Sequence, residues 1–166
     1  ALTIALAAIG NFSWSMVPGY VIAQFAGAFV GAVLVYVLFA GQFEVTKDQG
    51  TKLGVFCTGP SIANTGLNLL SEIIGTFVLV FAILGIGNVE NAGSMGLNYF
   101  FVFAMSLGGL TGYAINPARD LGPRLAHAVL PIPGKGDSNF GYAWIPVVGP
   151  IIGALLAGGL FVIIPW

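Results

Sequence analysis

The fold is decided by the stretch Gly112-Tyr113-Ala114-Ile115-Asn116-Pro117-Ala118-Arg119-Asp120. Asparagine is a strong N-cap and proline suits the first helical position, so Asn116 and Pro117 predict a helix start. Arg119 does not fit an ordinary helix start, because a cation in the first turn opposes the positive end of the helix dipole. A charge within an apolar sequence indicates a functional site. The alternative is an arginine held only by neighbouring carbonyl groups.

The sequence around this stretch is apolar enough for a lipid bilayer. Hydrophobic residues make up 57% of the chain and charged residues 7%, whereas soluble domains carry about 25% charged residues. Four apolar runs approach or exceed the ~20 residues that cross hydrocarbon as a helix; they are residues 16–40, 69–87, 95–113 and 142–164. We therefore expect an all-α integral membrane protein in the cell membrane. A net charge of −1 gives no basic surface for nucleic acid.

Two segments of the chain share a glycine pattern. Residues 24–32 and residues 146–154 both end in Gly-x-x-x-Gly-Ala, and such small residues let membrane helices approach closely. Each follows a short helix-like segment, residues 1–9 and residues 117–128. A helix of ~13 residues reaches only ~20 Å of a ~30 Å hydrocarbon core. Half-spanning segments are tolerated when they are buried in protein or line water, so they predict an aqueous path.

The pattern divides the chain into two repeats. Residues 1–40 are the end of the first repeat, residues 41–66 a polar linker between the repeats, and residues 67–166 the second repeat. The second repeat has two spans before its short helix, so we expect two further spans ahead of Ala1, which end in a counterpart of Asn116-Pro117. Three spans per repeat give the repeats opposite orientations, with a pore near the bilayer midplane.

The residue types in the stretch 112–120 fit a filter for neutral polar solutes. The helix N-terminus and Arg119 give a fixed positive potential that repels cations, protons included. The side chain of Asn116 can accept from its own helix and donate from its NH₂ group. Carbonyl acceptors are expected from the residues ahead of it, namely Gly112, Tyr113, Ala114 and Ile115. Together these groups would replace water around a hydroxylated solute.

The nine residues of the opening stretch resemble the second signature loop of the major intrinsic protein family, the aquaporins and aquaglyceroporins. The run from Ala1 to Ala5 resembles the sequence that follows Asn-Pro in the first signature, so Ala1 is the remnant of that motif. The resemblance covers nearly the whole chain. It implies an inverted repeat whose two half-spanning helices meet at the midplane, an NPA motif at Asn116-Pro117-Ala118, no cofactor, and a homotetramer with one pore per copy.

The same resemblance indicates the solute. Asp120 directly after Arg119, and Pro146-Val147 in the last run, are similar to glycerol facilitators. Arg119 and Tyr113 correspond to filter residues, and Ala104 to a position where water-selective members usually have histidine and glycerol channels usually glycine. A fourth filter residue is expected upstream. Tyr113 has an alternative role as an aromatic anchor at the membrane interface.

Glu72 is a second charge within an apolar run. From the residues, it is either an interfacial side chain near water or an acceptor for N–H groups that have no water in a bilayer. The resemblance implies the second role, bracing the signature loop. Cys57 carries no expected role, and we expect His127 to pack rather than to ligate a metal.

We expect passive diffusion of glycerol and small polyols, with water, through this protein. The sequence shows no nucleophile–base pair, metal cluster or phosphate loop, so neither catalytic nor metal-binding residues are assigned and no enzyme is expected. Few ionisable residues lie in the spans, which disfavours a proton-coupled transporter. A water-selective pore, and a non-conducting membrane scaffold or adhesion protein, stay open as alternatives.

Overall fold

The computed structural model describes residues 1–87 and 110–165, and within these ranges the regular secondary structure is helical. This confirms the predicted all-α class. The elements are α1 (Leu2–Ala8), η1 (Trp14–Met16), α2 (Val17–Leu38), α3 (Ala40–Val45), α4 (Gln49–Phe56), α5 (Thr65–Gly87), α7 (Pro117–Val129) and α8 (Ile145–Ile163). Most of the expected span 95–113 lies outside the described residues.

Three helices in the described part of the chain are long and apolar enough to cross a membrane: Trp14–Leu38, Thr65–Gly87 and Ile145–Ile163. They fall on three of the four predicted runs. The last one begins at Ile145 and not at residue 142, because the preceding residues form turns. In these turns Tyr142 N donates to Asn139 O at 3.1 Å and Ile145 N donates to Tyr142 O at 3.0 Å.

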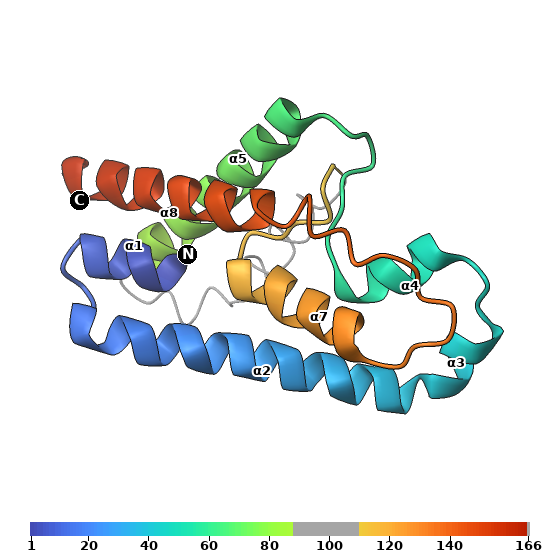
Figure 1. The fold of residues 1–166 in the computed structure, drawn as a ribbon. Helices are drawn as coiled ribbons and strands as arrows, with labels where there is room; N and C mark the ends of the chain where they lie inside the picture. Colours follow the sequence, from blue (N-terminus) through green and yellow to red (C-terminus); the bar gives the residue numbers. More distant parts are fainter. Residues whose placement is uncertain (88–109, 166) are drawn as a thin grey trace.

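The two short helices, α1 and α7, begin near each other in the middle of the molecule and run in opposite directions (Figure 1). The long helix α2 passes along both of them, and α8 packs against α5 and α1. This is the arrangement of half-spanning helices that the family resemblance implies. It places the N-termini of both short helices beside one cavity.

Glycines allow α8 to approach α5 closely. A Cβ atom added to Gly153 would lie 2.2 Å from Ile73 O and 2.9 Å from Phe77 N, and one added to Gly149 would lie 2.7 Å from Glu72 Cβ. The glycines of residues 146–154 therefore pack within this chain, as small residues do at membrane helix crossings. In residues 24–32, an added Cβ atom at Gly27 or Gly31 meets no atom within 4 Å.

We expect Gly153→Leu to destabilise the folded chain far more than Gly159→Leu. A side chain at Gly153 would collide with the backbone of α5, whereas a Cβ atom at Gly159, on the same helix, meets nothing within 4 Å. Overpacking of this kind costs about 1–3 kcal/mol or more. The measurement is the fraction of protein that stays monodisperse in size-exclusion chromatography after heating. Equal losses in the two variants would contradict the close α5–α8 crossing.

The linker between the repeats, predicted as a polar loop over residues 41–66, contains α3 and α4. Asp48 caps α4, since its Oδ2 accepts from Thr51 N at 2.6 Å. Lys52 on the same helix is buried, and its Nζ donates to the carbonyl of Pro133. These contacts dock the linker onto the loop that follows α7, so the linker forms part of the wall around the site described next.

Candidate functional site

The helix α7 begins as its sequence predicts. Asn116 is the N-cap in an extended conformation, and its Oδ1 accepts from Ala118 N at 3.0 Å. Pro117 is the first helical residue. Arg119 therefore lies in the first turn with an exposed side chain, while its neighbour Asp120 is fully buried.

The backbone ahead of Asn116 adopts unusual conformations. The φ angles are +80° at Gly112 and +42° at both Tyr113 and Ile115. Left-handed φ values are rare for bulky and β-branched residues and cost about 1–3 kcal/mol each. Residues 110 and 111 form a turn and residues 112 and 113 have no regular secondary structure, which corrects the prediction that a helical span continues to residue 113.

Glu72 holds this strained segment from the side of α5. Its side chain is 1% exposed. Its Oε1 accepts from Thr111 Oγ1 at 2.6 Å and from Ala114 N at 3.1 Å, and its Oε2 accepts from Ile115 N at 2.8 Å. The structure thus places Glu72 in the buried position that the family resemblance implies, not at an interface with water. Its bracing role stays a prediction.

Two cavities lie on either side of Tyr113 and Arg119. The larger, of about 730 Å³, is lined by Ala1, Leu2, Thr3, Leu6, Phe12, Tyr20, Gln24, Leu79, Val80, Ile83, Tyr113, Ala114, Ile115, Asn116 and Arg119. The other, of about 430 Å³, is lined by Gly50, Leu53, Gly54, Cys57, Thr58, Gly59, Pro60, Gly112, Tyr113 and Arg119. The two linings share Tyr113 and Arg119, which indicates a constriction at this pair.

The constriction combines a cation, an aromatic ring and backbone carbonyls. The guanidinium carbon of Arg119 lies 5.7 Å from the centre of the Tyr113 ring, within cation–π range. The run from Gly112 to Ile115 passes from the smaller cavity into the larger one. Within this run Ala114 is buried and borders the larger cavity together with Tyr113 and Ile115.

Most of the predicted site residues that the structure describes come together here. Ala1 and Asn116 line the larger cavity, at the starts of the two short helices. Ala104, the predicted small residue of the filter, lies outside the described residues. Asp120 does not line either of these cavities; its carboxylate points into the protein.

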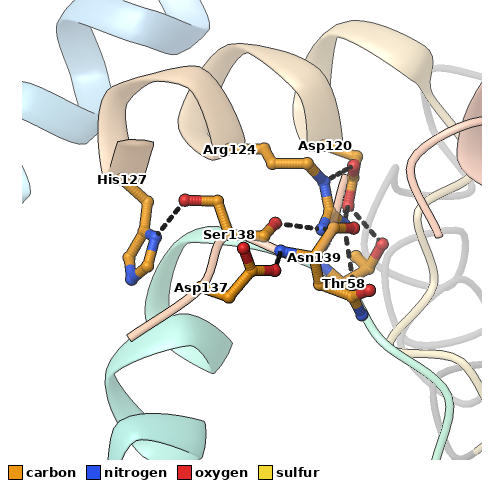
Figure 2. Close-up of polar contacts among 7 residues, drawn as sticks. All are labelled: Thr58, Asp120, Arg124, His127, Asp137, Ser138 and Asn139. Carbon is orange, nitrogen blue, oxygen red and sulfur yellow. Dashed lines mark hydrogen bonds and ion pairs between the residues drawn. The ribbon is translucent and has the colours of Figure 1, made fainter. Parts of the chain in front are cut away.

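A buried ion pair next to the filter was not predicted from the sequence (Figure 2). Arg124 Nε donates to Asp120 Oδ2, and its Nη2 donates to Asp120 Oδ1 and to Thr58 O, each at 2.8 Å. Its Nη1 donates to the carbonyls of Ser138 and Asn139 at 2.8 and 2.9 Å. All five N–H groups of the guanidinium are thus used. The available signal was the i, i+4 spacing of Asp120 and Arg124 on one helix.

The end of α7 is held by two further polar contacts. His127 is buried, and its Nδ1 lies 2.8 Å from Ser138 Oγ (Figure 2). Its ring lies 5.5 Å from that of Phe56, so it packs as expected. Lys135 Nζ donates to the carbonyls of His127, Ala128 and Leu130, which satisfies the helix C-terminus and complements its dipole.

Comparisons with known proteins agree with this architecture. The family model described as major intrinsic protein matches residues 1–161. A probable glycerol uptake facilitator protein of Thermotoga maritima is 56% identical over 97% of this chain and 70% of its own length. The glycerol uptake facilitator protein of Bacillus subtilis is 58% identical over 97% of this chain and 60% of its own length.

A solved structure shows the same fold. The aquaglyceroporin from Plasmodium falciparum superposes with a TM-score of 0.75 at 27% identity, over 96% of this chain and 68% of that one. The helix arrangement, the signature loop and the family match lead to one conclusion. The chain is an integral membrane protein of the major intrinsic protein family.

Proposed function

We propose that the protein is a channel for passive facilitated diffusion of glycerol and other small neutral solutes, with water, across the cell membrane. The observation that carries this proposal is the constriction at Tyr113 and Arg119, where two cavities meet. It lies beside a helix N-terminus and a strained backbone segment, a combination that helix packing alone does not require.

The constriction can treat the two sides of a polyol differently. Arg119 supplies N–H donors, and the carbonyls of Gly112, Tyr113 and Ile115 supply acceptors, so the solute's hydroxyl groups exchange water for protein partners. The Tyr113 ring offers an apolar wall to the carbon backbone. The NH₂ group of Asn116 supplies a further donor in the larger cavity. A neutral solute thus passes without carrying its hydration shell.

Ions meet an electrostatic barrier at the same place. The guanidinium of Arg119 and the N-terminal end of α7 both present positive charge to the path. A cation would lose hydration and gain repulsion, so neither metal ions nor protons should pass.

The relatives support glycerol as the solute. Two proteins more than 55% identical to this chain carry the name glycerol uptake facilitator, and a 50% identical protein of Streptococcus pneumoniae does as well. The small residue Ala104 would leave room for a carbon backbone. By the family resemblance we also propose two upstream spans that complete the pore, and four copies with one pore each.

The proposal is tested with proteoliposomes that contain the protein with the two upstream spans predicted by the repeat. In a glycerol gradient, light scattering should report glycerol entry well above that of protein-free vesicles, together with fast water flux. Water flux without glycerol flux would favour a water-selective pore. Neither flux would favour a scaffold or adhesion protein.

Replacing Arg119 by leucine should let ions through. One unit charge at about 4 Å and an effective dielectric of about 20 contributes about 4 kcal/mol of repulsion, so we expect the proton or potassium leak to rise by tenfold or more. The leak is measured with a pH-sensitive dye trapped in the vesicles under an imposed potential. Arg119→Lys is the control, because it keeps the charge and loses the planar donor fork. A leak in Arg119→Leu no larger than in the wild type would contradict the barrier.

A further inference from the structure

The segment of residues 57–61, here called the entrance segment, is the first part of the connection from α4 to α5 and lines the smaller cavity. Cys57, Thr58, Gly59 and Pro60 belong to that lining, together with Tyr113 and Arg119. The segment has no regular secondary structure, so its position depends on the contacts that it makes with its neighbours.

Hydrogen bonds join the entrance segment to α7 at one end and to the backbone ahead of Tyr113 at the other. Thr58 N and Thr58 Oγ1 donate to Asp120 Oδ1 at 2.8 and 2.5 Å, and Thr58 O accepts from Arg124 Nη2 at 2.8 Å (Figure 2). At the other end of the segment, Ser61 N donates to Leu110 O at 3.1 Å. The segment is therefore tied to the helix that carries Arg119 and to the backbone that leads into Tyr113.

Thr58 contacts a chain neighbour of each filter residue: Asp120, next to Arg119, and Gly112, next to Tyr113. Asp120, which accepts a hydrogen bond from the Thr58 hydroxyl, is adjacent to Arg119 in the chain. On the other side, a Cβ atom added to Gly112 would lie 3.7 Å from Thr58 Cβ and Cγ2, so the methyl group of Thr58 packs on the residue before Tyr113. One buried side chain thus relates the positions of the cation and the aromatic wall.

The acceptor for Thr58 is fixed in place. Asp120 is fully buried, and Arg124 holds it with two hydrogen bonds on the same helix. Hydrogen bonds to a charged acceptor are roughly twice as strong as those between neutral groups. Loss of one such bond should therefore change the population of the loop arrangement by about tenfold.

We propose that Thr58 is a positioning residue for the filter: its hydrogen bonds to Asp120 hold the entrance segment as a wall that faces Tyr113 and Arg119 at the width of a polyol. The inference rests on the proposed channel function for its consequence on solute choice. The position of the segment itself is independent of that function and can be measured separately.

Cys57 is a natural reporter of this position. It is the single cysteine of the chain, it is 6% exposed, and burial raises the pKa of its thiol to about 12. Since the thiolate is the reactive form, a maleimide should label it slowly at pH 8. A displaced entrance segment would expose the thiol and speed up the labelling.

The test compares variants that differ in one hydroxyl group. Thr58→Val keeps the shape and the backbone N–H and removes the hydroxyl donor to Asp120. Thr58→Ser keeps both donors. Thr46→Val is the matched control, because Thr46 is a half-buried threonine of the linker, away from the filter, whose Oγ1 donates to Gln42 O at 2.7 Å. Thr58→Ala is the second variant should valine prevent folding, since it leaves space for a water beside the carboxylate.

We expect Cys57 labelling to speed up about tenfold in Thr58→Val, the factor that corresponds to about 1.4 kcal/mol. Thr58→Ser and Thr46→Val should stay within about twofold of the wild type. Labelling in Thr58→Val at the wild-type rate would overturn the positioning role, whatever the channel conducts.

The second measurement is the ratio of glycerol to water permeability in proteoliposomes. We expect this ratio to change several-fold in Thr58→Val, because glycerol is larger than water and is more sensitive to the position of the wall. The ratio should return with Thr58→Ser. A proportional loss of both fluxes would mean fewer folded channels and would overturn the inference. A wild type that passes water without glycerol would instead overturn the proposed solute, and Cys57 labelling would still decide the role of Thr58.

Discussion

Glu72→Ala is expected to abolish solute flux, through loss of the filter or of the folded chain. The carboxylate is buried and accepts three hydrogen bonds, from Thr111 Oγ1, Ala114 N and Ile115 N. Alanine would leave these donors without a partner inside the protein. Each orphaned buried donor costs about 1–3 kcal/mol, and two of them belong to the segment with left-handed φ angles, which depends on those bonds.

Glu72→Gln should retain part of the flux. A glutamine has one carbonyl oxygen, which can take over either the contacts of Oε1 or the contact of Oε2. The Thr111 hydroxyl can rotate to accept from the NH₂ group, but a backbone N–H cannot. In either orientation one backbone N–H, of Ala114 or of Ile115, therefore faces another donor. The glutamine variant should lie between the wild type and alanine.

The measurement is glycerol flux per reconstituted channel by stopped-flow light scattering, together with the yield of monodisperse protein. Normalising flux to folded protein separates a misplaced filter from a missing channel. Wild-type flux from correctly assembled Glu72→Ala would contradict the bracing role. A glutamine variant as impaired as alanine would show that both carboxylate oxygens are indispensable.

Much of the fold was predictable because it follows from length and hydropathy. The bilayer sets how many apolar residues a spanning helix needs, and the runs that became α2, α5 and α8 meet that length. The start of α7 was predictable for a local reason, since Asn116 and Pro117 are residues that begin helices. Tyr113 and Arg119 lie in the same short stretch, so their proximity did not depend on the rest of the fold.

The parts that were not predictable depend on contacts between distant residues. Thr58 and Asp120 are 62 positions apart, and nothing in either local sequence indicates that they meet. Asp120 was interpreted only as a feature of glycerol facilitators, and its ion pair with Arg124 was missed. The helices α3 and α4 were missed because they are short and lie in a polar linker, although Asp48 is a residue type that caps helices.

Arg124→Met should destabilise the folded protein about as strongly as Glu72→Ala. Removing one partner of a buried ion pair leaves an uncompensated charge and costs about 3–5 kcal/mol. Asp120 would keep Thr58 as a donor and lose both bonds from the guanidinium. Arg124→Lys should also be weakened, because one ammonium group cannot reach the carboxylate and the carbonyls of three other residues at once.

The measurement is the temperature at which half of the protein is lost from the monodisperse peak, an operational stability suited to irreversible unfolding. The double variant Asp120→Asn/Arg124→Met removes both charges and should recover part of the loss, which gives the coupling between the pair. A half-loss temperature in Arg124→Met equal to that of the wild type would contradict the prediction.

Recovery in the double variant should nevertheless be incomplete. Arg124 also satisfies the carbonyls of Thr58, Ser138 and Asn139, and neither methionine nor asparagine replaces those bonds. The residual loss would measure how far Arg124 joins the loop after α7 to the entrance segment, apart from its pairing with Asp120. A full recovery would mean that the charge pair alone accounts for the buried arginine, and that these carbonyls find water when it is removed.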